Sequence, residues 1–190
     1  MIAFETILVW TALFRELWVA IRTFTRQGHA PLSSLLALSF WVNAYQARYA
    51  EPSGWPRLVG FALLIASLTL LEWAAFSIRG KMFSYLGSTD TPQFVFTGGP
   101  YAFIRHPFYS CYLHTHIAIA LIFPTRWTIA VVAFTFVLLR YATEFEENKF
   151  ARSPHAEAYK AYMARTGRFW PRFRRYVSLA ILVRFWRLPA

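Results

Sequence analysis

Three long runs of apolar residues decide what this chain can fold into. Residues 31–47 and 107–125 contain no Asp, Glu, Lys or Arg, and residues 58–78 contain only Glu72. A helix needs about 20 mostly apolar residues to cross a bilayer, where only helices and closed barrels satisfy their backbone hydrogen bonds. The runs therefore predict an all-α, polytopic integral membrane protein.

Two further segments raise the predicted number of membrane spans to about five. Residues 127–139 are apolar, and the helical pattern continues past Arg140, which predicts a span over 127–145. Residues 2–21 are also apolar but carry Glu5, Arg15 and Glu16. These charges leave two interpretations open for the first segment, because a helix that lies in the membrane interface accommodates them as well as a spanning helix does.

The last two spans are predicted to form an antiparallel hairpin, because only a tight turn separates 107–125 from 127–145. The chain from 146 to 190 is then a cytoplasmic tail. Within it, residues 176–188 are apolar but too short to span easily, and we expect an interfacial helix there. No repeat or linker divides the sequence, so residues 1–190 are interpreted as one membrane domain.

The charge of the chain is explained by its place in a membrane. The net charge is +11, although only 15% of the residues are charged and 57% are hydrophobic. With five spans, thirteen Lys and Arg gather at the loops and tail on one side, against three on the other. Cytoplasmic segments carry such an excess, and we expect no nucleic-acid partner. The single cysteine, Cys111, excludes an internal disulfide and a cysteine-based metal cage, and we predict no metal site.

The sequence G-G-P-Y-A-F-I-R-H-P-F-Y-S-C-Y, from Gly98 to Tyr112, leads into the fourth span. Pro107 is suited to the first position of a helix, where no backbone N–H is needed. Arg105 and His106 then precede a helix start, and free N–H groups and the helix dipole attract anions there. The open alternative is that Arg105 anchors the chain at the interface and the prolines only shape a turn.

Three of the nine acidic residues gather near the predicted cytoplasmic end of the fifth span: Glu144, Glu146 and Glu147. Acids are disfavoured at a helix C-terminus, which indicates that a cation needs them. Against the Arg-His pair they would form a zwitterionic site suited to an amino-acid moiety. The alternative is that they only balance Lys149 and Arg152.

Spaced motifs follow one another through the C-terminal two thirds of the chain. They are G-P-Y-x-x-x-R-H-P-x-Y at 99–109, E-E-x-x-F at 146–150, Y-x-x-Y-x-x-R at 159–165, and a proline at 171. In this order they resemble the isoprenylcysteine carboxyl methyltransferase family, which is related to phospholipid methyltransferases. The resemblance covers about residues 58–175.

This resemblance implies an enzyme that uses S-adenosylmethionine as methyl donor at the cytoplasmic face. The expected acceptor is a lipophilic carboxylate of the prenylcysteine kind, with a phospholipid amine or a small thiol as alternatives. The expected cofactor-binding residues are Tyr101, Arg105, His106, Pro107, Tyr109, Glu146, Glu147, Tyr159 and Arg165. The residues expected to act in catalysis are Arg105, His106, Arg140 and Glu146.

Three departures from the family pattern bear on the site. Cys111 stands where the family usually has glycine, and Ser153-Pro154-His155 replaces a usual Phe-Gly. Ala142 stands where the family has an arginine, and the nearest arginine is Arg140, four residues before Glu144. Which two of the three glutamates act is therefore open.

Helical spacing separates the two adjacent glutamates. Neighbours on a helix point about 100° apart, so Glu146 and Glu147 cannot face one point equally. Glu147 shares a face with Glu144 and Arg140. We therefore expect Arg140 to orient Glu147 and Glu146 to bind the amine of the cofactor.

Two other classes of protein compete with the enzyme hypothesis. His114 and His116 in the fourth span could ligate a haem, although no second span offers a facing histidine. A buried, hydrogen-bonded role is the more common one for such histidines. A membrane scaffold without enzymatic activity is the other competitor.

Overall fold

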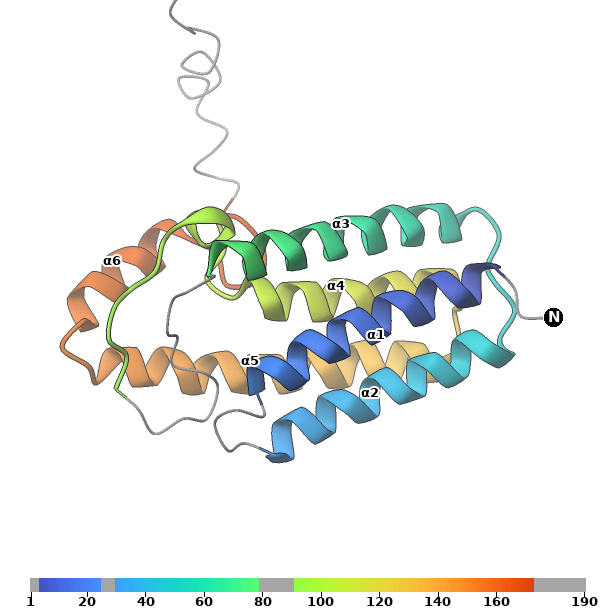
Figure 1. Cartoon of the computed structure of the whole chain (residues 1–190), viewed down its shortest axis with the longest axis horizontal. Helices are drawn as coiled ribbons and strands as arrows, with labels where there is room; N and C mark the ends of the chain where they lie inside the picture. Colours follow the sequence, from blue (N-terminus) through green and yellow to red (C-terminus); the bar gives the residue numbers. More distant parts are fainter. Residues whose placement is uncertain (1–3, 25–29, 79–90, 173–190) are drawn as a thin grey trace, which may run out of the picture.

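The computed structural model describes residues 4–24, 30–78 and 91–172, and these residues form helices joined by turns, without a sheet (Figure 1). The all-α class predicted from the sequence is therefore confirmed for this part of the chain. In chain order, the elements are α1 (Phe4–Phe24), α2 (Ala30–Tyr49), α3 (Pro56–Ser77), the 3₁₀ helix η2 (Gly99–Ala102), α4 (Pro107–Ile122), α5 (Arg126–Ala151) and α6 (Ala156–Arg165).

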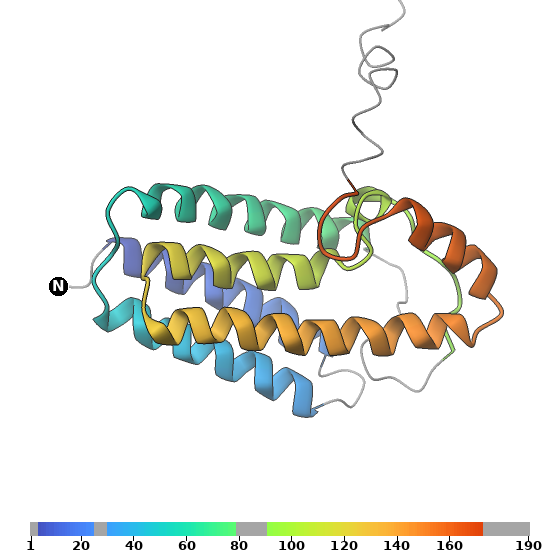
Figure 2. The ribbon, with the colours of Figure 1, turned by 180° about the vertical axis from the view of Figure 1, so that it is seen from behind.

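Helices α1 to α5 lie side by side as a bundle in which consecutive helices run in opposite directions (Figures 1 and 2). The central helix is α4, which contacts each of the other four. Eleven of its sixteen residues are buried, against seven of 26 in α5. The apolar run of α4 thus packs against protein, while the other helices keep an outer face.

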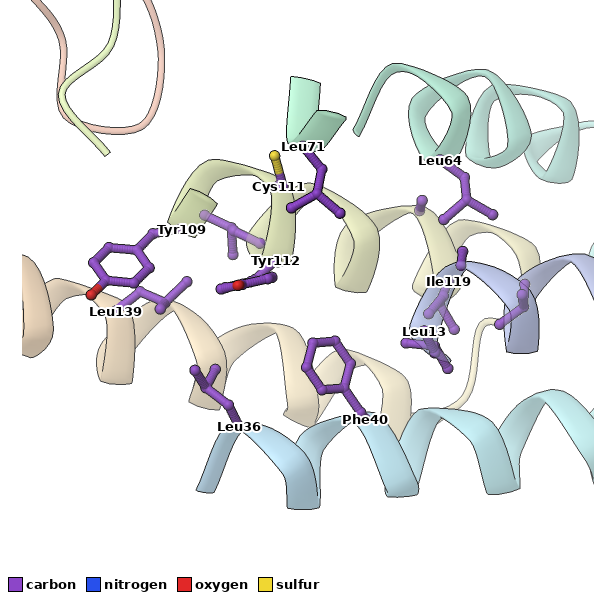
Figure 3. Packing of buried hydrophobic residues seen from close by; sticks show 14 of the residues in the cluster. Leu13, Leu36, Phe40, Leu64, Leu71, Tyr109, Cys111, Tyr112, Ile119 and Leu139 are labelled. Atoms are coloured by element: carbon purple, nitrogen blue, oxygen red, sulfur yellow. The ribbon is translucent and has the colours of Figure 1, made fainter. Parts of the chain in front are cut away.

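The closest packing in the bundle joins α3 to α4. A Cβ atom at Gly60 of α3 would lie 2.7 Å from Ile122 Cγ1 and 2.8 Å from the Ala118 carbonyl oxygen. The glycine therefore lets the two backbones approach each other. Further along, Leu71 of α3 lies beside Cys111 of α4 (Figure 3).

Large apolar side chains cover the outer faces of the bundle. The exposed ones include Trp10, Phe14 and Trp18 on α1, Leu38 and Trp41 on α2, Ile65 and Phe76 on α3, and Phe134 and Val137 on α5. A soluble protein rarely exposes so much apolar surface. Among the described residues, α3 and α5 are long and apolar enough to cross a bilayer, and only 28% and 33% of their apolar windows are buried in the protein.

The predicted element boundaries hold to within three residues, except that α5 continues to Ala151, six residues beyond the predicted span. Helix α4 ends at Ile122, three residues before the predicted end, because Pro124 follows within a tight turn. Helix α5 begins directly afterwards, where the Thr125 side chain accepts a hydrogen bond from the Thr128 backbone N–H. The antiparallel hairpin of α4 and α5 is confirmed (Figure 2).

Helix α6 was not among the predicted elements, and it folds the tail back beside the end of α5 (Figure 1). The expected interfacial helix at 176–188 lies outside the described residues. The predicted count of about five spans stays a prediction, as does the treatment of the chain as one domain.

Candidate active site

The start of α4 is built as the sequence predicts. Pro107 occupies the first turn of the helix, and His106 is the N-cap residue. The approach to it is η2, which begins at Gly99 with a φ of +57°. A Cβ atom at this glycine would lie 2.1 Å from Ser77 Oγ at the end of α3. Only glycine therefore fits this turn.

The tail is bonded to the chain that leads into α4. The Arg105 backbone N–H donates to the Gly167 carbonyl at 2.9 Å, and the His106 N–H donates to the Arg168 carbonyl at 3.2 Å. The Tyr162 hydroxyl donates to another carbonyl of the same connector at 2.7 Å. These bonds hold the segment after α6 against the start of α4.

Glu147 of α5 is the most heavily bonded acid of the charged cluster that forms here. Its Oε1 atom accepts a hydrogen bond from Arg105 Nε at 2.9 Å and lies 3.2 Å from His106 Nε2. Arg168 donates to both carboxylate oxygens through Nε and Nη2. Glu147 is buried, and burial alone would destabilise its negative charge. The two arginines and the histidine neutralise this charge.

Glu146 has a different environment. The Tyr109 hydroxyl donates to its Oε1 atom at 2.7 Å, and its Oε2 atom lies 3.2 Å from His106 Nδ1. Its side chain is 19% exposed, against 10% for Glu147. No arginine among the described residues pairs with Glu146, so it is the carboxylate most available to an external cation.

His106 lies between these two carboxylates and stacks on the Tyr109 ring, with centroids 5.7 Å apart and planes 12° apart. Burial disfavours the charged imidazolium. The hydrogen bonds and negative charges of Glu146 and Glu147 outweigh this effect and raise the pKa of His106 above its usual value. The two carboxylates thus favour the cationic form of His106.

Comparison with known proteins identifies the family of this chain. Residues 55–158, more than half of the chain, match the family model of phospholipid methyltransferases. The chain belongs to this family. No curated protein and no solved structure matches it.

Membership of the phospholipid methyltransferase family makes this chain a membrane methyltransferase. The match supports the phospholipid methyltransferases, which the sequence analysis named as a related family. It does not single out the isoprenylcysteine carboxyl methyltransferases. It spans the start of α4 and both glutamates of α5, and it ends just before Tyr159. The tail residues of the site therefore lie beyond the matched region.

The expected partnership of Arg140 with Glu147 is wrong. Arg140 instead donates to Glu144, one helical turn further along α5. Glu147 lies seven residues from Arg140, about 10 Å along the axis, and it faces the arginines of the connector and tail. Arg105 donates to Glu147 through Nε and to the Thr166 carbonyl through Nη1 at 2.6 Å, and its expected contact with the cofactor stays a prediction.

Arg168 is the site residue that the sequence did not reveal. The predicted tail residue, Arg165, is exposed and donates to the carbonyl of Ala161 within its own helix at 3.3 Å. Ile104 of the connector and Gly167 of the tail pair as an isolated β-bridge. Arg168 comes directly after this bridge, and its side chain bonds to Glu147. Its signal in the sequence was only its position three residues after the motif arginine.

One hydrogen-bond donor of the Arg168 guanidinium has no acceptor. Its Nη1 atom is buried and has no hydrogen-bond partner among the described residues. Glu144 Oε1 lies 3.5 Å away, which is an ion pair without hydrogen-bond geometry. The arrangement suits an anionic group that approaches from the cluster.

The tyrosines of α6 pack the tail against α5. The Tyr159 ring stacks on Phe150, with centroids 4.1 Å apart and planes 8° apart. Burial raises the pKa of Tyr159 and of Tyr162 well above the usual value, so both hydroxyls stay protonated. Tyr101 packs edge to face on Phe96. Cofactor contacts of Tyr101 and Tyr159 stay predictions.

The histidines considered for haem have other neighbours. His116 forms hydrogen bonds at both ring nitrogens, with Ser39 Oγ at 3.1 Å and Asn43 Nδ2 at 2.6 Å. His114 packs against Trp170. Haem ligation by His116 would break one of its two bonds. In the described ranges, no group of three or more His, Cys, Asp or Glu side chains is arranged to hold a metal ion.

Proposed function

We propose that this protein transfers the methyl group of S-adenosylmethionine to a lipid acceptor, and that the donor binds at the His106–Glu146 cluster. The observation that supports this proposal most is the partial exposure of Glu146 beside a neutralised Glu147. One carboxylate organises the cluster, and its neighbour remains for a ligand.

The residues fit the charged groups of the donor, which carries an ammonium, a carboxylate and a sulfonium. Glu146 would bind the ammonium, and the Nη1 atom of Arg168 would bind the carboxylate. The stacked rings of His106 and Tyr109 offer a flat surface next to Glu146. Arg105 and Glu147 then act as the support that fixes Arg168 and His106 in place.

The bound donor supplies a methyl group on a positively charged sulfur, which needs no metal for transfer. The chain contributes position and exclusion of water. Pro107 and the buried turns of α4 close the cluster on the bilayer side, while the tail covers it from the other side. The acceptor would approach along the apolar outer faces of the bundle.

The family match favours a phospholipid amine as acceptor. The prenylcysteine carboxylate expected from the sequence resemblance stays a second candidate, and a small thiol the third. We further propose the five-span arrangement with the donor site at the cytoplasmic face, because the ends of α1 and α3 that lead into the basic loops lie at the same end of the bundle as α6 (Figure 1).

The experiment uses purified full-length protein in nanodiscs and a radiolabelled methyl donor. The acceptor panel contains phosphatidylethanolamine, a farnesylated cysteine analogue and a small alkyl thiol. We expect label in the phosphatidylethanolamine product and saturable donor binding in calorimetry. Donor binding with label only in the farnesyl ester would replace the amine by the carboxylate, and absence of donor binding would refute the enzyme proposal.

A further inference from the structure

Glu16 of α1 is a carboxylate in the interior of the bundle with an exposed fraction of 0%. Its Oε1 atom accepts hydrogen bonds from Ser67 Oγ of α3 at 3.3 Å and from the Thr115 hydroxyl of α4. An acid at membrane depth is expensive and usually serves a function. Glu16 is not part of the His106–Glu146 cluster, the proposed site of the methyl donor, which is called the donor cluster below.

Two orphan polar atoms lie in this region. Glu16 Oε2 and the hydroxyl of Tyr112 are buried and have no hydrogen-bond partner in the described part of the chain. Buried polar atoms in proteins are almost always bonded. Tyr112 lies three residues before Thr115 on α4, so its side chain shares a face of the helix with the residue that bonds Glu16. A ligand that donates hydrogen bonds would satisfy both atoms.

The position of this pair relates it to the donor cluster. Thr115, which holds Glu16, lies six residues after Tyr109 on α4, or about 9 Å along the helix axis towards the membrane interior. The rings of Tyr109 and Tyr112 have centroids 6.4 Å apart. Tyr109 joins the donor cluster through its bond to Glu146, and Tyr112 lies between Tyr109 and Thr115 on the same helix.

The groups that surround Glu16 carry no described positive charge. Ser67 of α3 and Thr115 of α4 are neutral, and the titratable neighbours are Cys111 and Tyr112 of α4. On α1 itself, Arg15 forms an exposed ion pair with Glu72 of α3 at 2.6 Å. The buried Ser39 and Asn43 of α2 bond to His116. A carboxylate acceptor would find no cation here, whereas an ammonium group fits.

We propose that Glu16 and Tyr112 form the site for the acceptor nitrogen and that Glu16 takes the proton which the nitrogen must lose. This inference rests on the proposed function with an amine acceptor. An ammonium N–H donates to Glu16 Oε2 and another to the Tyr112 oxygen. The proton moves to Glu16, and the nitrogen lone pair forms the new N–C bond. The C–S bond breaks with its electrons on sulfur, and Glu16 releases the proton to water when the product leaves.

The first test compares Glu16→Gln with wild type in the phosphatidylethanolamine assay. Glutamine keeps the side-chain volume and an oxygen for the Ser67 and Thr115 hydroxyls but cannot take a proton. We expect kcat to fall roughly a hundredfold at neutral pH and to recover partly as pH rises and the amine loses its proton in water. Donor affinity in calorimetry should change less than about twofold.

Glu72→Gln is the matched control, because Glu72 is also a carboxylate of the bundle but is exposed and paired with Arg15. We expect its kcat and pH profile to match wild type. Wild-type kcat in Glu16→Gln across the pH range would overturn the proposal. An equal loss at every pH in both variants would assign the effect to structure and would also overturn it.

A second measurement needs no variant and stands if Glu16→Gln fails to fold. Infrared difference spectra of the wild-type protein, recorded at about pH 9 so that the buried Glu16 starts ionised, should show a new protonated carboxyl band when phosphatidylethanolamine is added. Phosphatidylcholine, whose nitrogen carries no proton, should not produce this band. No band with either lipid refutes the role of Glu16. Failure of wild-type donor binding would instead refute the proposed function, so the two failures are distinguishable.

Discussion

Glu146 and Glu147 are adjacent on α5 but meet different parts of the protein. Glu147 is buried against Arg105 and Arg168, whereas Glu146 is held by one hydroxyl, that of Tyr109, and by the histidine between them. Helical geometry demands such a separation, because successive residues point about 100° apart. Their separate roles in binding stay predictions.

We predict that Glu146→Gln weakens binding of S-adenosylmethionine about ten- to a hundredfold, because a hydrogen bond to a charged group contributes roughly 1.5–3 kcal/mol. The change should lower the unfolding midpoint only modestly, because glutamine keeps an oxygen for the Tyr109 hydroxyl and Glu147 remains beside His106. Calorimetry measures the affinity. Glu144→Gln is the control on the same helix, since Glu144 is exposed and paired with Arg140. Equal affinities in the two variants would contradict the assignment.

The protonation of His106 predicts a pH dependence of stability. Its raised pKa in the folded protein means that it binds a proton more tightly there than in the unfolded chain. The resulting stabilisation is complete below the unfolded value, about 6.5, and is lost as pH rises through the raised folded value. We expect the unfolding midpoint in detergent to fall over this window.

His106→Gln is the control for this titration, because the variant has no imidazole to protonate. The difference in unfolding midpoint between wild type and variant should shrink as pH rises. A difference that stays constant with pH would show that the two carboxylates do not hold a cationic histidine.

At the scale of elements, α4 is positioned by its contact with α3. The contact depends on Gly60, which faces the backbone of α4 at Ala118. At the other end of this helix pair, Gly99 packs so closely against the end of α3 that a Cβ atom there would collide with Ser77. The start of α4, and with it the cluster, is therefore fixed by close packing at both ends of α3.

We predict that Gly60→Ala destabilises the protein by about 1–3 kcal/mol, because a methyl group there meets the Ala118 carbonyl at 2.8 Å. The gain in helix propensity of about 1 kcal/mol does not offset this clash with backbone. Unfolding in a denaturing detergent measures the change. Gly54→Ala serves as control, since nothing lies within 4 Å of its added atom. Similar midpoints in both variants would refute the close approach.

At the scale of the whole molecule, the loops of the bundle divide between two ends. At one end, the Ser53 backbone N–H donates to the Ile122 carbonyl at 2.7 Å, and Thr125 Oγ1 donates to Gln46 at 2.9 Å. The donor cluster and α6 lie at the opposite end (Figure 2). Seven described basic residues belong to the connector, the end of α5 and the tail at this second end: Arg105, Lys149, Arg152, Lys160, Arg165, Arg168 and Arg172.

We predict that the two ends face different sides of the membrane. A cysteine at exposed position 126 should react with an impermeant maleimide from the outer side, and a cysteine at exposed position 157 only from the cytoplasmic side. The native thiol, Cys111, is buried and gives no background. Labelling of both positions from one side would overturn the topology.

The sequence by itself determined the membrane class, the helices and the turn before α4, because these depend on local composition and on the backbone limits of glycine and proline. It also singled out the Arg-His pair and the acidic end of α5. Only the tertiary structure decided which charges meet. Arg168 replaced Arg140 beside Glu147, since hydrogen bonds between tail and connector decide that contact.

The surroundings of Glu16 were likewise decided by the tertiary structure. In the sequence it was one of three charges that weakened a predicted span, beside Arg15 and Glu5. In the folded bundle it is buried against Ser67 and Thr115, which come from helices 51 and 99 residues away. Contacts at such separations depend on how helices rotate against one another, and no local pattern of residues specifies that rotation.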